Sequence, residues 1–179
     1  AMLSSTHEEQ KGPQTYLLGT LGKHNVILQQ CGIGKVNAAC GVTQMIIQYK
    51  PDCVISTGVA GGIDSRLQVM DVVVSDRVCY HDVWCGEGCD PGQVQGLPTF
   101  FPCDKELVDK ALQIHTGVRV VPGLICTGDR FITARAELNE IKGNYLDGLA
   151  VDMESAAISQ VCHLFGIPFV SFRIISDTP

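Results

Sequence analysis

The residues from 151 to 177, reading VDMESAAISQVCHLFGIPFVSFRIISD, constrain the fold more than any other stretch. Apolar residues recur at helical spacing after an acidic opening, which predicts a helix that begins near Glu154 and ends at Gly166. Pro168 cannot continue that helix. The run that follows is almost continuously apolar and contains β-branched residues, which is typical of a buried strand. A helix that leads directly into a buried strand indicates an α/β chain.

Asp177 comes directly after this predicted strand. An open α/β sheet has its ligand crevice at the carboxyl ends of its strands, so Asp177 should face it and Glu154 can reach it. Each acid also has a structural explanation, because Asp177 could cap a following helix and the helix dipole favours a first-turn acid such as Glu154. Together with Arg173 on the same strand, they form a candidate site with a general acid, a second carboxylate and a positioning cation.

Strand and helix patterns alternate through the rest of the chain. Residues 1–13 are polar and predict no strand, whereas residues 15–20 and 25–30 predict a hairpin. The glycine-rich residues 57–62 are expected to form a loop after a strand. The class predicted is α/β, a single domain with a central twisted mixed β-sheet flanked by helices. The other elements are strands at 52–56, 71–80, 118–126 and 148–151, and helices at 36–50, 104–115 (capped by Asp104) and 133–142 (capped by Thr133).

Composition narrows the partners and the location. The chain has 179 residues, of which 45% are apolar, enough for the core of one domain. Its net charge of −6 is not gathered into runs, which argues against nucleic acid or an anionic membrane and favours a small uncharged or cationic ligand. Nine cysteines, mostly in apolar runs, and the absence of a signal-peptide pattern predict reduced thiols and the cytoplasm. No apolar run approaches the ~20 residues of a membrane span.

Three local patterns allow weak functional interpretations. The GIGK sequence at 32–35 looks like a phosphate loop, but Val36 stands where Ser or Thr would hold magnesium. The glycines of residues 57–62 fit a plain tight turn as well as a ligand-binding loop. A histidine and two cysteines could bind zinc, although a single C-x3-C pair is a weak signal: His81, Cys85 and Cys89.

Six motifs occur in order along the chain: GIGKVNAA (32–39), STGVAGG (56–62), DVVVSD with YHD (71–82), TGDRFI (127–132), VDMESAAI (151–158) and RIISD (173–177). Together they resemble the bacterial 5′-methylthioadenosine/S-adenosylhomocysteine nucleosidases of the nucleoside phosphorylase superfamily. The resemblance runs from about Tyr16 to the last residue. It implies hydrolysis of the N-glycosidic bond of these small nucleosides to adenine and a 5-thio-substituted ribose, without a cofactor or metal.

The resemblance also implies catalytic roles. Asp177, steadied by Ser176, would protonate N7 of the adenine, which is a poor leaving group as an anion. Burial can raise the pKa of such an acid and so keep it protonated, and we expect this of Asp177. Glu154 would bind the ribose hydroxyls and stabilise the positive charge that develops on the sugar. Arg173 completes the catalytic set.

The same resemblance implies a set of substrate contacts. Met153 would pack against the sugar, and Phe131 and Ile132 would hold the base by stacking and by backbone hydrogen bonds. We expect further substrate-binding residues at Ile33, Val59, Ala60, Gly61 and Asp152. The family pattern also has a first strand with a water-activating acid, more than thirty positions before the GIG motif, and a C-terminal helix. Residues 1–179 are expected to form a nucleoside phosphorylase-like domain that lacks both.

Two other functions stay open. A phosphorylase would need an anion site, and related phosphorylases carry an arginine and a serine in the loop that corresponds to residues 56–59. This chain has only Ser56 and Val59 there. A nucleoside-binding protein without catalysis is the second alternative, because no water-activating acid can be assigned, although Asp177, Glu154 and Arg173 are all retained.

A homodimer is the expected assembly. The family members most similar to this chain are homodimers, and residues 81–102 carry more large apolar groups than an exposed loop usually tolerates. We expect this segment to be partly buried against a second subunit and to help complete its pocket. The apolar groups concerned are Val83, Trp84, Leu97, Phe100 and Phe101.

Overall fold

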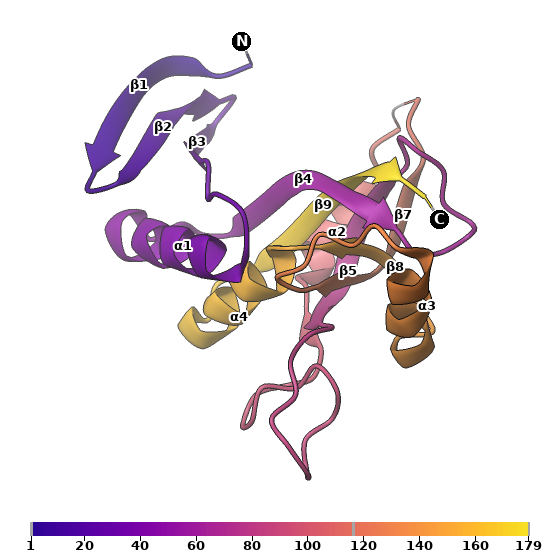
Figure 1. The fold of residues 1–179 in the computed structure, drawn as a ribbon. Helices are drawn as coiled ribbons and strands as arrows, with labels where there is room; N and C mark the ends of the chain where they lie inside the picture. The colour runs from indigo at the N-terminus through magenta and orange to yellow at the C-terminus, as the bar shows by residue number, and fades with distance from the viewer. Residues whose placement is uncertain (1, 116, 179) are drawn as a thin grey trace.

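The structure is a computed structural model that describes residues 2–115 and 117–178. Within these ranges a mixed sheet has the strand order β6-β5-β7-β8-β4-β9 (Figure 1). The expected α/β class with a mixed sheet flanked by helices is therefore confirmed. The strands of this sheet are β4 (Val54–Gly62), β5 (Val72–Tyr80), β6 (Phe101–Pro102), β7 (Val120–Thr127), β8 (Gly148–Asp152) and β9 (Phe169–Asp177).

The sheet closes on itself because β5 pairs with two neighbours besides the short β6. One is β7, in parallel, and the other is β9, in the antiparallel direction. The chain of pairs β5-β7-β8-β4-β9 then returns to β5. In this ring Thr127 pairs with Asp152, and Gly61 pairs with both Val151 and Asp177. The carboxyl ends of four strands, β4, β7, β8 and β9, thus meet at one rim.

Four helices in the described ranges flank the sheet: α1 (Lys35–Tyr49), α2 (Lys105–Leu112), α3 (Arg135–Asn144) and α4 (Ser155–Phe165). The apolar stripe of α4 is buried against the sheet and α1, as its periodicity predicts. This helix ends at Gly166, which has the left-handed φ of 68° that glycine adopts without strain. Asp104 caps α2 as expected, because its Oδ1 accepts a hydrogen bond from the Leu107 N–H at 2.9 Å.

An antiparallel sheet of β1 (Ser4–Lys11), β2 (Gln14–Leu21) and β3 (His24–Gln29) lies beside α1 (Figure 1). Its second and third strands confirm the hairpin, but β1 corrects the expectation of no strand in residues 1–13, of which residue 1 lies outside the described residues. Almost all of β1 is exposed, so it carries no apolar alternation and is held by backbone pairing to β2. The Tyr49 hydroxyl anchors this sheet by donating to Glu9 Oε2 at 2.9 Å.

Two further expectations were wrong. Residues 57–62 are not a loop, because β4 continues to Gly62. A Cβ at Gly62 would lie 3.3 Å from a methyl group of Ile175, so glycine lets β4 pack closely against β9. Helix α3 begins at Arg135 after Ala134, not at Thr133, and the Ala134 N–H donates to Glu137 Oε2 at 3.4 Å.

Residues 81–100 form the expected long irregular loop, which Figure 1 shows extending away from the sheet. Its apolar groups are mostly used within the chain: Phe101 is buried, and Val83 and Leu97 pack against the core. Trp84, at 69% exposure, and Phe100 are large apolar side chains of this loop that stay exposed. No helix in the described ranges has the length and apolar character required to cross a membrane.

Candidate active site

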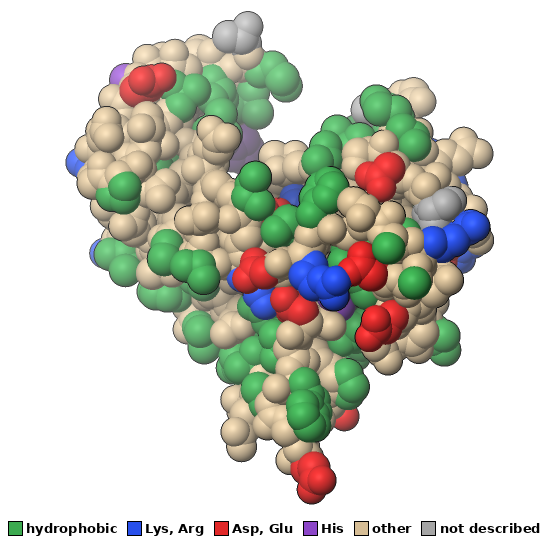
Figure 2. All heavy atoms as spheres, in the orientation of Figure 1, with side chains coloured by type: hydrophobic (Ala, Val, Ile, Leu, Met, Phe, Trp, Pro, Cys, Tyr) green, Lys and Arg blue, Asp and Glu red, His purple; other side chains and the backbone are tan. Residues whose placement is uncertain are grey.

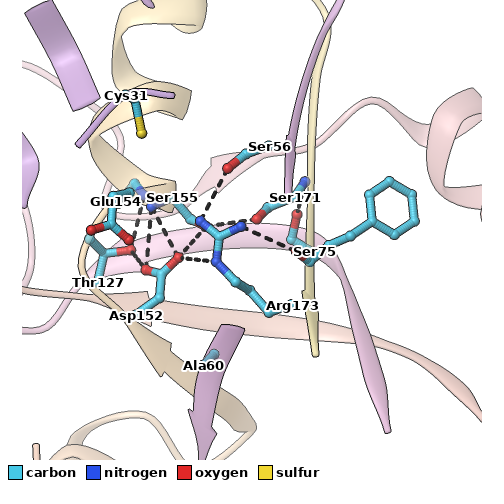
Figure 3. A network of polar contacts seen from close by, with 12 residues as sticks. Cys31, Ser56, Ala60, Ser75, Thr127, Asp152, Glu154, Ser155, Ser171 and Arg173 are labelled. Carbon is cyan, nitrogen blue, oxygen red and sulfur yellow. Dashed lines mark hydrogen bonds and ion pairs between the residues drawn. The ribbon is translucent and has the colours of Figure 1, made fainter. Parts of the chain in front are cut away.

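A buried ion pair lies under the rim where the strands end (Figure 3). Arg173 of β9 donates from Nε to Asp152 Oδ2 at 2.8 Å and from Nη2 to Ser56 Oγ at 3.1 Å. Both charged side chains are buried, so each compensates the charge of the other. Among the described residues, the side-chain hydrogen bonds of Arg173 go to Asp152, Ser56 and the Phe172 carbonyl oxygen, and not to Glu154 or Asp177. Its geometry is that of a positioning residue.

Asp152 is the centre of a set of hydroxyl contacts. Thr127 donates to its Oδ1 at 2.5 Å, and both the hydroxyl and the N–H of Ser155 donate to its Oδ2, the latter at 3.1 Å. The Ser155 and Ser171 hydroxyls lie 2.7 Å apart, which joins the first residue of α4 to β9. The sequence places Asp152 among the substrate contacts, but both its oxygens are engaged inside the protein. The network fixes the start of α4 relative to the sheet.

Glu154 stands at the start of α4 and is partly exposed. Its carboxylate makes no capping bond to α4, and its Oε1 instead accepts a hydrogen bond from the Gly34 N–H at 2.9 Å. Cys31 lies nearby in Figure 3, and burial together with the charge of Glu154 raises the pKa of its thiol. Met153, the preceding residue, is half-buried. The backbone thus fixes one oxygen of the carboxylate, Oε1, through the Gly34 N–H.

Asp177 is the last residue of β9 and pairs with Gly61 of β4. The Ser176 hydroxyl donates to Asp177 Oδ1 at 2.6 Å, and it also lies 3.3 Å from the carbonyl oxygen of Ala60. The expected burial of Asp177 is wrong, because this residue is exposed. Its position at the end of an apolar strand did not reveal that, since exposure there depends on what packs over the rim.

The predicted substrate contacts differ in the elements that carry them and in how far they are buried. Ala60 and Gly61 lie in β4 beside Ser176 and Asp177. Phe131 is 83% exposed, whereas Ile132 packs against the cluster around Leu124. Ile33 and Val59 are also exposed apolar residues. Figure 2 shows the molecule hollowed between the N-terminal sheet and its main body, with hydrophobic side chains on both sides of the hollow.

The zinc alternative finds no support in the geometry. Within the described ranges no three His, Cys, Asp or Glu side chains lie close enough together to hold a metal ion. His81 instead packs against Gly128. A Cβ added to that glycine would lie 2.4 Å from Nε2 of His81. Burial lowers the pKa of the His81 imidazole, which favours its neutral form.

Several residues of this region had no assigned role in the sequence interpretation. The hydroxyls of Thr127, Ser155 and Ser171 were overlooked: Thr127 ends β7, Ser155 begins α4 and Ser171 lies within β9. Lys35, Asp82 and Asp129 were quoted within motifs but received no structural role, and they contact one another above the rim. Each of these three residues belongs to a short motif that follows a strand. This shared placement after strands could have indicated that their side chains lie close together.

Comparison with known proteins identifies relatives along the whole chain. The family model of the phosphorylase superfamily matches residues 2–179. The 5′-methylthioadenosine/S-adenosylhomocysteine nucleosidase of Chromohalobacter salexigens is 43% identical over 179 residues, which cover 98% of this chain and 76% of that protein. The nucleosidase of Haemophilus influenzae is 44% identical over 162 residues, covering 89% of this chain and 71% of that protein.

Solved structures agree with this assignment. The nucleosidase of Colwellia psychrerythraea, in complex with adenine, superposes with a TM-score of 0.94 at 37% identity, covering 99% of this chain and 75% of that one. The nucleosidase of Neisseria meningitidis, in complex with methylthio-immucillin-A, gives a TM-score of 0.93 at 37% identity, covering 98% and 78%. The chain therefore belongs to the phosphorylase superfamily and, within it, to the family of 5′-methylthioadenosine/S-adenosylhomocysteine nucleosidases.

Proposed function

We propose that this protein hydrolyses the N-glycosidic bond of 5′-methylthioadenosine and S-adenosylhomocysteine, releasing adenine and the 5-thio-substituted ribose. The observation that carries the proposal is the arrangement of two carboxyl groups around β4: Glu154 follows β8 on one side and Asp177 ends β9 on the other. Relatives that share 43–44% of the sequence are named as nucleosidases for these two substrates. One solved relative holds adenine, the expected product.

The proposed chemistry divides the work between the two acids. The carboxyl of Asp177, oriented by Ser176, gives its proton to N7 of adenine while the C1′–N9 bond breaks and its electron pair goes to the base. Positive charge then develops on the ribose, and the Glu154 carboxylate stabilises it while binding the ribose hydroxyls. Water adds to C1′ and loses a proton. Through solvent, this proton replaces the one that Asp177 gave to the base, so the acid form is restored and the step balances.

The base and the sugar would be held by apolar contacts. Phe131 is almost fully exposed and so is available to stack on adenine, next to the backbone of Ile132. Met153 would pack against the sugar beside Glu154. The remaining contacts are proposed at Ile33, Val59, Ala60 and Gly61, whereas Asp152 would act indirectly through Arg173 and α4.

The charges around the rim favour water over phosphate as the nucleophile. Ser56 already accepts a hydrogen bond from Arg173, whose charge is paired with Asp152. The two other cations that could replace an anion clamp are also engaged, because Lys35 pairs with Asp82 and Arg66 pairs with Asp64. A phosphate ion would have to break one of these pairs, and this supports hydrolysis rather than phosphorolysis.

The test is to follow adenine release from 5′-methylthioadenosine with and without inorganic phosphate and to identify the sugar product. We expect the same rate in both conditions and a free 5-methylthioribose. A ribose 1-phosphate would overturn hydrolysis and favour the phosphorylase alternative. Calorimetric binding of the nucleoside without any adenine release would instead favour a binding protein without catalysis.

We also propose a homodimer in the cytoplasm. The assembly rests on the resemblance and on the exposed Trp84, since most other apolar groups of residues 81–102 pack within the chain. All nine cysteines are free thiols, which supports a reducing compartment. Light scattering should give the mass of two chains at micromolar concentration, and Trp84→Ser should shift the mass towards one chain. A fully active monomer would contradict the dimer.

A further inference from the structure

Three charged residues from distant parts of the chain form a closed set of contacts above the rim, here called the Lys35 cluster (Lys35, Asp82 and Asp129). Lys35 Nζ donates to both carboxylate oxygens of Asp82 at 2.8 Å. Asp82 Oδ2 accepts from the Asp129 N–H at 2.8 Å, and Asp129 Oδ1 accepts from the Lys35 N–H at 2.8 Å. The cluster therefore ties the beginning of α1 to the loops that follow β5 and β7.

The cluster supplies hydrogen-bond acceptors that the beginning of α1 lacks within its own sequence. The first N–H groups of a helix have no partner within the helix, and α1 has glycine at its N-cap and no acid in its first turn. Two carboxylates from elsewhere supply the missing acceptors: Asp129 binds the Lys35 N–H, and Glu154 binds the Gly34 N–H. Each negative charge is also favoured by the dipole of α1. Asp129 and Glu154 therefore bind adjacent peptide groups.

The close approach requires glycine at position 34. Gly34 has a φ of 90°, and a Cβ there would lie 3.0 Å from Asp129 Oδ1. The side chains of the ion pair are sheltered, since 22% of Lys35 and 20% of Asp82 are exposed. Burial raises the pKa of Asp82, but the Lys35 hydrogen bond and the Asp129 N–H outweigh it and lower that pKa overall. The ion pair between Lys35 and Asp82 thus anchors the cluster.

We propose that Asp129 is a positioning residue for Glu154. By fixing the Gly34–Lys35 peptide, it holds the adjoining Ile33–Gly34 peptide, whose N–H orients the Glu154 carboxylate towards the ribose. Asp129 also lies two residues before Phe131, so the same carboxylate links the loop that would hold the base to the acid that would hold the sugar. This inference rests on the proposed function, because it requires Glu154 to act on the substrate.

A double-mutant cycle between Asp129 and Glu154 tests the inference. Asp129→Ala should lower kcat/KM for 5′-methylthioadenosine by about 10-fold or more, because a displaced carboxylate loses its productive geometry. In the Glu154→Ala background, measured in single turnovers, the same change should cost less than about 2-fold, because no carboxylate remains to be positioned. Asp129→Asn keeps an acceptor oxygen and should restore most of the loss.

The matched control is Asp147→Ala, which removes an exposed ion pair with Arg77 remote from Glu154 and should leave kcat/KM unchanged. If Asp129→Ala does not fold, as judged by its thermal transition, the cycle is run with Lys35→Met, which removes the anchor of Asp82. Equal losses in both backgrounds would overturn the inference alone. A wild-type protein that releases no adenine, or an unchanged kcat/KM in Glu154→Ala, would instead remove the proposed function and this inference with it.

Discussion

Arg173 Nε lies 2.8 Å from Asp152 Oδ2, and only 3% and 1% of the two side chains are exposed. Removing one partner would leave a buried charge without compensation. Arg173→Met should therefore lower the free energy of unfolding by about 3–5 kcal/mol. The double variant Arg173→Met with Asp152→Asn should recover part of this loss, because no unpaired charge remains. Urea unfolding of both variants at pH 7 measures the difference, and a loss below about 1 kcal/mol would contradict the pairing.

Asp177 and Ser176 allow a test of the acid step. Asp177→Asn should lower kcat by about 100-fold or more and leave nucleoside binding largely intact, because the amide cannot give up a proton to the base. Ser176→Ala should have a smaller effect, since it removes only the hydrogen bond at 2.6 Å that orients the carboxyl. Steady-state adenine release and calorimetric binding are the measurements. Near-normal turnover in Asp177→Asn would remove Asp177 from the mechanism.

Asp64 should make the stability of the fold depend on pH. Its carboxylate binds Arg66 and Lys142, each at 2.7 Å, and hydrogen bonding to Arg66 is the main cause that lowers its pKa. A lowered pKa stabilises the folded state above the unfolded value of about 3.9, and this contribution disappears as the pH falls below that value. Asp64→Asn should thus cost about 1–3 kcal/mol at pH 7 and progressively less below about pH 4.

Unfolding of the wild type and Asp64→Asn by urea at pH 7 and at about pH 3 checks this expectation. Asp76→Asn is a suitable control, because Asp76 is exposed and its ion pair is with the neighbouring Arg77. A difference between wild type and Asp64→Asn that stays constant over this range would show that the charge of Asp64 is not what stabilises the fold.

The cysteines should react in the order of their exposure. Cys40 and Cys85 are exposed, whereas Cys79, Cys126 and Cys162 are buried. Burial also raises the pKa of the Cys162 thiol to about 12, so it is not a thiolate at neutral pH. Alkylation followed by mass spectrometry should label the two exposed cysteines first and the three buried ones only after unfolding. Early labelling of Cys162 would contradict its packing between α4 and the sheet.

The strongest sequence patterns predicted the fold well. The stretch from α4 to β9 carries a helical stripe and a buried strand, and both occur where the pattern indicates, with Gly166 between them. The exposed strand β1 has no such stripe, so only its pairing with β2 reveals it. Residues 57–62 were misinterpreted because glycine is rare within strands, and the close packing of β4 on β9 that requires it is invisible in one sequence.

The candidate site was predicted in outline but not in its connections. Motifs after strands indicated that Glu154 and Asp177 approach the same rim, which depends only on topology. The contacts of Glu154 with Gly34 and of Asp129 with Lys35 join residues 120 and 94 positions apart. No local periodicity records such contacts. The exposure of Asp177 likewise depends on packing over the strand end, and the sequence around it gives no measure of that.

The pairing of β5 with both β7 and β9 affects which parts of the protein open locally to solvent. In the ring β5-β7-β8-β4-β9 every strand has a neighbour on each side, and residues 172–174 of β9 pair with both β4 and β5. The amide hydrogens of this segment are bonded in one ladder or the other, so each exchanges with solvent only when a neighbouring strand separates. Amide hydrogen exchange should be slowest there and fastest in β1, which pairs on one side. Arg173 and Asp152 would then belong to the most slowly opening part of the molecule. The hydrogen bonds that hold Gly34 and Asp129 lie outside these ladders, so they can open without separating the strands.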